Sequence, residues 1–328
     1  MKEIKIAFLG FGVVGQGTYT VLTQNKKLIE NRLNCDIKVV RILEAVKSRY
    51  GLLGTDSGIF TDNFEDILND ESVQIVVEMM GGIDFAADCM EKALLAGKHV
   101  VSSNKAALAA RLPKLNAAAK EGGAILLYEA SVGGAIPVMH AVQTSLAANE
   151  FLSIEGIVNG TSNYILTKMS KEGLSYEQAL KQAQKKGFAE ADPTADVEGI
   201  DSANKLCLLT ANAFGFYADP AKIERVGITG VTPEQIKQAE SQNSVIKLIA
   251  KAEKQGDGFE LSVKPQLLPS DHPLASVDNE FNAIRIVGNM CDEIFLKGRG
   301  AGSLPTGSAV AGDILEIAGF IASNDFVK

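Results

Sequence analysis

The segment Ile4-Lys5-Ile6-Ala7-Phe8-Leu9-Gly10-Phe11-Gly12-Val13-Val14-Gly15 decides the fold. Its first six residues predict a short buried strand, and a helical pattern follows from Val13 to Ile29. Gly10, Gly12 and Gly15 have the spacing G-x-G-x-x-G between this strand and this helix. The first glycine allows a tight turn, the second lets a pyrophosphate approach the backbone, and the third allows close helix packing. This context indicates a dinucleotide-binding unit.

Strands and helices alternate after this opening. Further strands are predicted at 36–43, 73–79, 99–102 and 124–128, and helices at 84–96 and 105–120. This alternation predicts an α/β fold with a Rossmann-type, doubly wound parallel sheet over residues 1–133.

The pattern changes after Gly134, where longer amphipathic helices and β-rich stretches follow one another. The helices are predicted at 137–146, 162–171, 175–186 and 202–214, and the strands at 151–158, 261–267 and 282–287. We expect a second, α+β domain for catalysis and dimerisation over residues 134–302. The apolar segment 303–320 predicts a long helix, so residues 303–328 are expected to return to the first domain.

Composition excludes several classes of protein. The chain has 328 residues, a net charge of −8 and a pI near 5.1, which argues against nucleic-acid binding. The N-terminus enters a strand without a charged leader, and no unbroken apolar stretch reaches the roughly 18 residues of a membrane span, so secretion and membrane insertion are disfavoured.

The cysteines form no CxxC pair, so neither a zinc site nor a disulfide framework is indicated. They are Cys35, Cys89, Cys207 and Cys291. Reduced thiols and a cytoplasmic location are expected.

A second informative stretch runs from Gly187 to Lys205 and contains five carboxylates. Asp201 and Lys205 lie at i and i+4 of a predicted helix and therefore share one face. The apolar residues that follow indicate a buried helix, so Lys205 is predicted to point into a cleft where desolvation tunes an amine for proton transfer. The alternative is a solvated acidic loop with an ordinary ion pair worth about 0.3–0.5 kcal/mol.

Ordered motifs over nearly the whole chain resemble the homoserine dehydrogenase family. Besides the acidic stretch, they are GFGVVG (10–15), SSNKA (102–106), EASVGGAIP (129–137), GIVNGTSNYIL (156–166) and GRGAGSLPTGSAV (298–310). The resemblance implies reversible NAD(P)-dependent hydride transfer between L-homoserine and L-aspartate 4-semialdehyde, in threonine, methionine and isoleucine biosynthesis.

Catalytic roles follow from the resemblance and from simple chemistry. Hydride transfer to an aldehyde carbon builds negative charge on oxygen, which needs a proton donor or a nearby cation. Lys205 is the expected acid, and the base in reverse, while Asp201 orients it or binds substrate. Lys105 follows a strand at the carboxyl edge of the sheet and is expected to support the charge; the alternative is a surface lysine at a helix start.

The substrate ammonium is expected to meet the carboxylates of Glu190, Asp196 and Asp201, with Glu190 the strongest family match. Gly160 and Thr161 resemble the family's substrate-proximal turn. The alternative for this turn is a helix N-cap formed by Thr161 or Ser162.

For the cofactor, we expect contacts from the turn Gly10, Gly12, Val13, Val14 and Gly15, together with Glu44, Lys105, Gly187 and Gly302. Many family members resemble Val-Arg-Asp or Val-Lys-Asp at the end of the second strand, but this chain has Ile42-Leu43-Glu44, so Leu43 replaces the basic residue while an acid remains. An acid there binds ribose hydroxyls, so NAD is slightly favoured over NADP. Lys47 and Arg49 are the basic alternative for a 2′-phosphate.

The segment after Tyr128 resembles the family's loop for a monovalent cation. On this match a sodium ion is held by Glu129 and by the carbonyls of Val132, Gly134 and Ile136. The alternative is a strand-to-loop junction without an ion.

The resemblance also implies a homodimer or a higher homo-oligomer. Because many relatives have a C-terminal ACT domain and no such motif follows residue 320, inhibition by threonine through such a domain is not expected.

Two other classes of protein share part of this pattern. A non-enzymatic dinucleotide sensor would keep the glycine-rich turn without needing Lys205 and its carboxylates. A different amino-acid or semialdehyde oxidoreductase would keep both and change the pocket. His99, His140 and His272 suggest no catalytic cluster, and Cys207 faces away from Lys205 on the predicted helix.

Overall fold

The computed structural model describes residues 1–53 and 57–324. The chain divides into two compact units, Met1–Ser131 with Gly302–Lys328, and Val132–Ala301. These bounds lie close to the division expected at Gly134 and Gly302, and the function of each unit stays a prediction.

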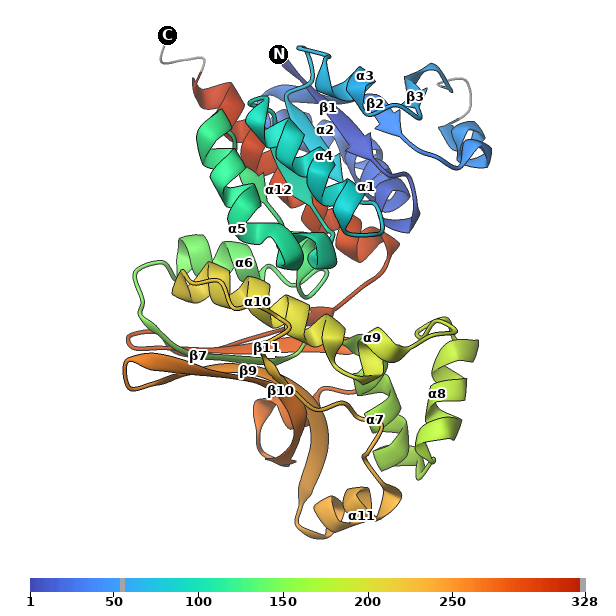
Figure 1. The fold of residues 1–328 in the computed structure, drawn as a ribbon, viewed down its shortest axis with the longest axis vertical. Coiled ribbons are helices and arrows are strands. Elements are labelled where there is room, and N and C mark those ends of the chain that lie inside the picture. The colour runs from blue at the N-terminus through green and yellow to red at the C-terminus, as the bar shows by residue number, and fades with distance from the viewer. Residues whose placement is uncertain (54–56, 325–328) are drawn as a thin grey trace. The chain divides into compact units, whose positions relative to one another are not determined.

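The first unit contains a six-stranded sheet with the order β3-β2-β1-β4-β5-β6 (Figure 1). Its paired strands are parallel throughout. The strands are β1 (Lys2–Leu9), β2 (Cys35–Leu43), β3 (Phe60–Thr61), β4 (Ile75–Glu78), β5 (His99–Ser102) and β6 (Leu126–Leu127). From β1 the chain adds β2 and β3 on one side of the sheet, and from β4 it adds β5 and β6 on the other side. The strand order therefore reverses between β1 and β4. The predicted doubly wound parallel sheet is confirmed.

Two groups of helices cover this sheet. Helices α1 (Val13–Gln24), α2 (Lys26–Leu33) and α12 (Ser303–Asn324) pack on one another, and α4 (Asp84–Leu95) packs on α5 (Lys105–Gly122). Shorter turns are η1 (Lys47–Leu53), η2 (Ser57–Ile59), α3 (Glu65–Leu68) and η3 (Glu129–Ser131).

The single helix predicted from Val13 to Ile29 is wrong. Asn25 interrupts it with φ −96° and ψ 12°, ending α1 and starting α2. Asparagine favours such cap positions because its side chain competes with the helical hydrogen bonds of the backbone.

Helix α12 belongs to the core of the first unit. Its apolar residues Val310, Ile314 and Ile317 are fully buried in the same cluster as Ile6 and Phe8 of β1. Among the described helices it alone is long and apolar enough to cross a membrane. A buried core helix meets the same criterion, and the packing of α12 is of that kind.

Glycine allows α12 to approach α1 closely. A Cβ atom on Gly17 would lie 2.1 Å from the Ser303 carbonyl oxygen, and one on Gly307 would lie 2.6 Å from the backbone of Gly17. Any larger residue at these two positions would force the helices apart.

The second unit contains a mixed sheet with the order β12-β11-β7-β9-β10-β8. Its strands are β7 (Phe151–Ile157), β8 (Glu224–Arg225), β9 (Ser244–Gln255), β10 (Gly258–Pro269), β11 (Phe281–Gly288) and β12 (Asp292–Arg299). They pair antiparallel except β8, which pairs parallel with β10. The expected α+β architecture is confirmed.

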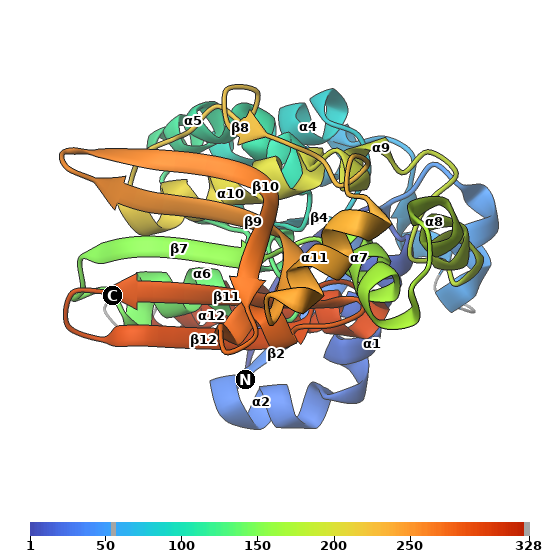
Figure 2. The same ribbon diagram turned by 90° about the horizontal axis from the view of Figure 1, so that it is seen from below.

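Helices α6 (Val138–His140) and α10 (Ile200–Phe214) lie on one face of this sheet, and the view from the other side shows its strands directly (Figures 1 and 2). The remaining helical segments are the π-helical turn Ala141–Ser145, α7 (Gly160–Glu172), α8 (Tyr176–Lys185), α9 (Thr194–Val197), α11 (Pro233–Ser241) and the 3-10 turn η5 (Pro273–Ser276).

Candidate active site

Lys205 and Asp201 form a buried ion pair one turn apart on α10. The Lys205 Nζ atom lies 2.7 Å from Asp201 Oδ2 and donates a second hydrogen bond to the Val158 carbonyl at 2.6 Å. Gly199, with φ 74°, precedes the helix and lets the chain turn into it. The two side chains share a face as predicted, and their burial excludes the alternative of a solvated surface pair.

Asn159, which was not predicted as a site residue, links this pair to the acidic loop. Its Nδ2 atom donates to Asp201 Oδ2 at 2.8 Å and to Asp196 Oδ1 at 2.7 Å. Its Oδ1 atom accepts from the backbone N–H of Ser162 at 2.9 Å and thereby caps α7. The alternative cap by Thr161 or Ser162 is therefore wrong. The preference of asparagine for N-cap positions was the signal available in the sequence.

The predicted turn residues Gly160 and Thr161 begin α7. Thr161 is buried, and its hydroxyl donates to the Phe188 carbonyl at 2.6 Å, which ties α7 to the segment after α8. A Cβ atom on Gly160 would lie 2.8 Å from the Glu280 carbonyl oxygen, so this position requires glycine.

The structure separates the other predicted residues of the acidic segment, with Gly187 and Glu190 exposed and Asp196 half-buried. Gly187 has φ 76° and follows the last turn of α8. Glu190 is exposed, and its backbone carbonyl accepts from Gln184 Nε2 at 3.1 Å. Asp196 thus joins the buried cluster through Asn159, and the Glu190 side chain faces solvent.

The glycine-rich turn in the first unit fits a dinucleotide. Gly10 has φ 95°, and a Cβ atom on Gly15 would lie 2.6 Å from the Gly10 carbonyl oxygen. Gly12 caps α1 without a side-chain hydrogen bond, and Val13 and Val14 follow in its first turn. The start of α1 therefore presents backbone N–H groups where a pyrophosphate is stabilised.

Glu44, just after β2, is buried and holds the glycine-rich turn. Its carboxylate accepts from the backbone N–H groups of Phe11 at 2.9 Å and Val46 at 2.8 Å, and from Arg49 at 2.9 Å. Burial alone raises the pKa of Glu44, but the hydrogen bonds from Val46, Arg49 and Phe11 outweigh it and place the pKa below its usual value. The Arg49 Nη1 atom lies 4.0 Å from the position that a Cβ atom on Gly12 would take.

Lys105 is the first residue of α5, directly beyond β5, and is partly buried. Asn104 caps this helix by accepting from the Ala107 N–H at 3.1 Å. The first unit also contains a fully buried acid that was not predicted, Glu78, at the end of β4. Burial raises its pKa to about 7, against the hydrogen bonds from Ser102, Met80 and Asn104.

The residues of the predicted cation loop belong to both units. In the first, Glu129 is buried and its N–H donates to Asp313 Oδ2 at 2.9 Å. In the second, Val132 and Ile136 are buried and Gly134 has φ 59°. No group of three or more His, Cys, Asp or Glu residues is arranged for a metal in residues 1–53 and 57–324, so a cation here would depend on carbonyl oxygens.

Gly302, the last predicted cofactor residue, has φ 129° and precedes α12, where its carbonyl accepts from the Thr306 N–H at 3.1 Å. Glycine tolerates this backbone conformation because it has no Cβ atom.

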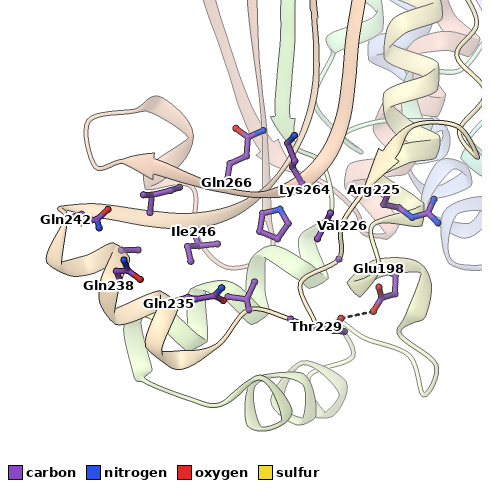
Figure 3. A pocket seen from close by; sticks show the side chains of 16 residues that line it. Glu198, Arg225, Val226, Thr229, Gln235, Gln238, Gln242, Ile246, Lys264 and Gln266 are labelled. Carbon is purple, nitrogen blue, oxygen red and sulfur yellow. Dashed lines mark hydrogen bonds between the residues drawn. The ribbon is translucent and has the colours of Figure 1, made fainter.

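A pocket of about 840 Å³ lies elsewhere in the second unit (Figure 3). Side chains from α11 and β10 line it together with the loop after β8, and Glu198 accepts a hydrogen bond from Thr229 at 2.9 Å on its wall. None of the predicted site residues lines this pocket.

The family models agree with this geometry. Residues 137–315 match the model described as homoserine dehydrogenase, and residues 10–129 match its NAD-binding domain. These two matches include the glycine-rich turn, Lys105, Asn159 and the Lys205–Asp201 pair.

Individual relatives agree as well. The homoserine dehydrogenase of Bacillus subtilis is 37% identical over 97% of this chain and 73% of its own length. A homoserine dehydrogenase from Thiobacillus denitrificans has a TM-score of 0.95 at 39% identity, over 98% of this chain and 75% of its own. A hyperthermophilic archaeal homoserine dehydrogenase in complex with NADPH has a TM-score of 0.81 at 27% identity, over 96% and 97% of the two chains. This chain belongs to the homoserine dehydrogenase family, whose members are NAD(P)-dependent oxidoreductases.

Proposed function

We propose that this chain catalyses the reversible oxidation of L-homoserine to L-aspartate 4-semialdehyde, with Lys205 as the group that moves the proton. The observation that carries the proposal is the buried pair of Lys205 and Asp201, fixed by Val158 and Asn159. A dinucleotide sensor would have no need for an ammonium and a carboxylate buried together, because their desolvation costs stability.

A bound nicotinamide supplies or accepts the hydride. As charge grows on the substrate oxygen, the Lys205 ammonium donates a proton to it, and in the reverse direction the amine takes the proton from the hydroxyl. Asp201 holds the ammonium in one orientation, since the donor must stay within hydrogen-bond reach of the reacting oxygen. Lys105 adds positive charge from the carboxyl edge of the parallel sheet.

The proposed partner of the substrate ammonium is primarily Glu190. Asp196 and Asp201 share the Asn159 amide, whereas the Glu190 side chain is exposed. Gly160 and Thr161 complete the proposed substrate turn at the start of α7.

The proposed cofactor contacts are the glycine-rich turn with Val13 and Val14, Glu44, Lys105, Gly187 and Gly302. We propose a slight preference for NAD, because Leu43 stands at the end of β2 where many relatives have a basic residue, while the acid Glu44 remains next to it. Arg49 is the group that would accept the 2′-phosphate of NADP, and NADPH is the ligand of the archaeal relative. A sodium ion at Glu129, Val132, Gly134 and Ile136 stays part of the proposal.

The proposed homodimer uses the sheet of the second unit. Strands β7, β11 and β12 of this sheet carry the ion pairs of Arg285 with Glu155 at 2.9 Å and with Glu293 at 2.7 Å. Light scattering tests this assembly, and a monomer at micromolar concentration would contradict it. The predicted cytoplasmic location is also part of the proposal.

The function is tested by following nicotinamide absorbance with L-homoserine and NAD or NADP, and with the semialdehyde and the reduced cofactors. Turnover is expected with at least one cofactor. Folded protein that binds a cofactor but turns over neither substrate would refute the proposed reaction and favour a related oxidoreductase or a sensor.

A further inference from the structure

Glu78 is a fully buried carboxylate at the carboxyl edge of the first sheet. It is the last residue of β4 and pairs with Leu9 at the end of β1 and with Ser102 at the end of β5. Because ligands bind outside the carboxyl ends of parallel strands, where the strand order reverses, the glycine-rich turn after β1 and the turns after β4 and β5 lie at the binding edge.

The Glu78 carboxylate accepts hydrogen bonds from the turn after β4 and from the end of β5 with the turn that follows it. Its Oε2 atom accepts from the Ser102 hydroxyl at 2.6 Å, and its Oε1 atom accepts from the Met80 N–H at 2.8 Å and more weakly from Asn104 Nδ2 at 3.4 Å. The turn after β4 and the turn after β5 therefore share one buried acceptor group.

Ser102 and Asn104 extend the network to the start of α5. The Ser102 hydroxyl oxygen accepts from the Asn104 N–H at 3.1 Å. The Asn104 side chain donates to the Gly82 carbonyl at 2.8 Å and caps α5 through Ala107. A continuous path of hydrogen bonds thus runs from Glu78 to the first turn of α5, which begins at Lys105.

A buried carboxylate costs free energy, because desolvation disfavours its charge. A neutral residue would fill the end of β4 at lower cost if packing were its whole task. The hydrogen bonds of Glu78 converge on the two turns of the binding edge, where precise backbone placement matters for hydride transfer.

We propose that Glu78 is a positioning residue for the nicotinamide end of the cofactor, fixing the turn at Met80 and the start of α5 with Lys105. It acts through Ser102 and Asn104. The inference rests on the proposed function in that a nicotinamide cofactor binds at this edge.

The test compares Glu78→Gln with Ser102→Ala and with their double variant. Glutamine keeps the shape but replaces one acceptor oxygen with a donor, so it cannot accept from both Met80 and Ser102. We expect Glu78→Gln to bind the reduced cofactor more weakly, seen as a larger dissociation constant measured by cofactor fluorescence. The kcat/KM for cofactor should fall roughly ten- to hundredfold. The KM for homoserine should stay within about twofold, and the two changes should be non-additive.

Lys98→Met is the matched control. Lys98 is also buried in the first unit, but it lies just before β5, at the amino edge of the sheet. It donates to the carbonyls of Asp70 and Val73, which precede β4. We expect it to lower the melting temperature while leaving the cofactor dissociation constant and kcat unchanged. A Glu78→Gln protein that behaves in the same way would overturn the proposal, and if this variant does not fold, Ser102→Ala decides by the same readouts.

Cofactor binding separates this inference from the reaction. Wild-type protein that binds the cofactor without oxidising homoserine refutes the proposed function, while the effect of Glu78→Gln on the dissociation constant still decides the role of Glu78. Folded wild-type protein that binds neither NADH nor NADPH would overturn both.

Discussion

The Nζ atom of Lys205 lies 2.7 Å from Oδ2 of Asp201, and a tenth of the lysine side chain is exposed. An exposed pair of this spacing on a helix is worth about 0.3–0.5 kcal/mol, but removing one partner of a buried pair costs about 3–5 kcal/mol. A test of Lys205 must therefore separate chemistry from folding.

Lys205→Met should lower kcat by about a hundredfold to ten-thousandfold, the range expected for loss of a general acid. Methionine is an unbranched side chain only one atom shorter than lysine and carries no charge. Steady-state kinetics give kcat, and fluorescence titration should show a cofactor dissociation constant close to that of the wild type. Turnover near the wild-type rate would contradict this role and assign the proton donor to Lys105 or to water.

Lys247→Met is the control for this variant. Lys247 is a second buried lysine of the same unit, where it lies 3.5 Å from Asp278 Oδ1 and 3.2 Å from Asn163 Oδ1. Its loss should lower the melting temperature and leave kcat within about threefold, because Asn163 of α7 and the segment before β11, not the substrate, accept its hydrogen bonds.

Glu190→Ala should raise the KM for homoserine about tenfold or more and change kcat much less, because a charge-assisted contact to the ammonium contributes about 1.5–3 kcal/mol. Glu177→Ala, an exposed glutamate on α8, is the matched control and should change neither parameter. An unchanged KM in Glu190→Ala would assign the ammonium to Asp196 or Asp201.

The sequence predicts the elements with strong local patterns. The run from Ile4 to Leu9 and the glycine spacing that follows define β1, the turn and α1, and the apolar residues after Lys205 define α10. Strand β9, with the sequence SVIKLIAKAEKQ, was missed because its spaced lysines suit a helix as well as a strand. Long-range pairing with β7 and β10 decides its structure.

The candidate site shows the same division. The spacing of Asp201 and Lys205 is local and was predicted, whereas Asn159 in the second unit and Glu78 in the first are each linked to their clusters by partners distant in the sequence. The N-cap preference of asparagine could have indicated the cap at Asn159 but not its bonds to Asp196 and Asp201, and a glutamate at the end of a strand carries no periodic signal, so tertiary structure is needed to find these contacts.

Arg49→Ala should reduce kcat/KM for NADP more than for NAD. Arg49 is paired with Glu44 beside Gly12, and a guanidinium–phosphate contact is worth about tenfold or more in affinity. The ratio of the two kcat/KM values measures the effect, and Lys27→Ala, an exposed charge on α2, serves as the control. An unchanged ratio would leave cofactor selection to Glu44 or Lys47.

Thiol reagents should spare the activity. Burial raises the pKa of Cys207 and of Cys89 to about 12, so neither thiol ionises near neutral pH. Incubation with iodoacetamide at pH 8, followed by mass spectrometry, should show modification chiefly at the less buried Cys291 with activity retained. Loss of activity in step with alkylation of Cys207 would contradict the assignment of the proton to Lys205.

The titration of Glu78 predicts how stability depends on pH. Burial raises the pKa of Glu78 from 4.5 to about 7 in the folded protein, so between these values the folded state binds more protons than the unfolded state. The free energy of unfolding contributed by this group is therefore fully present below about pH 4.5 and is lost as pH rises through about 7, by about 3 kcal/mol in total. The neighbouring Cys89 thiol stays neutral over this range.

Glu78→Gln removes the titrating group, so the fall in unfolding free energy between pH 5 and pH 8 should be about 2.5 kcal/mol smaller in the variant than in the wild type. Urea denaturation at a series of pH values measures both curves. The other buried carboxyls, including Asp313, are common to the two proteins and cancel in the difference. Parallel curves would mean that Glu78 ionises in the folded protein as readily as it does in the unfolded chain, and that its hydrogen bonds from Ser102 and Met80 fully offset its burial.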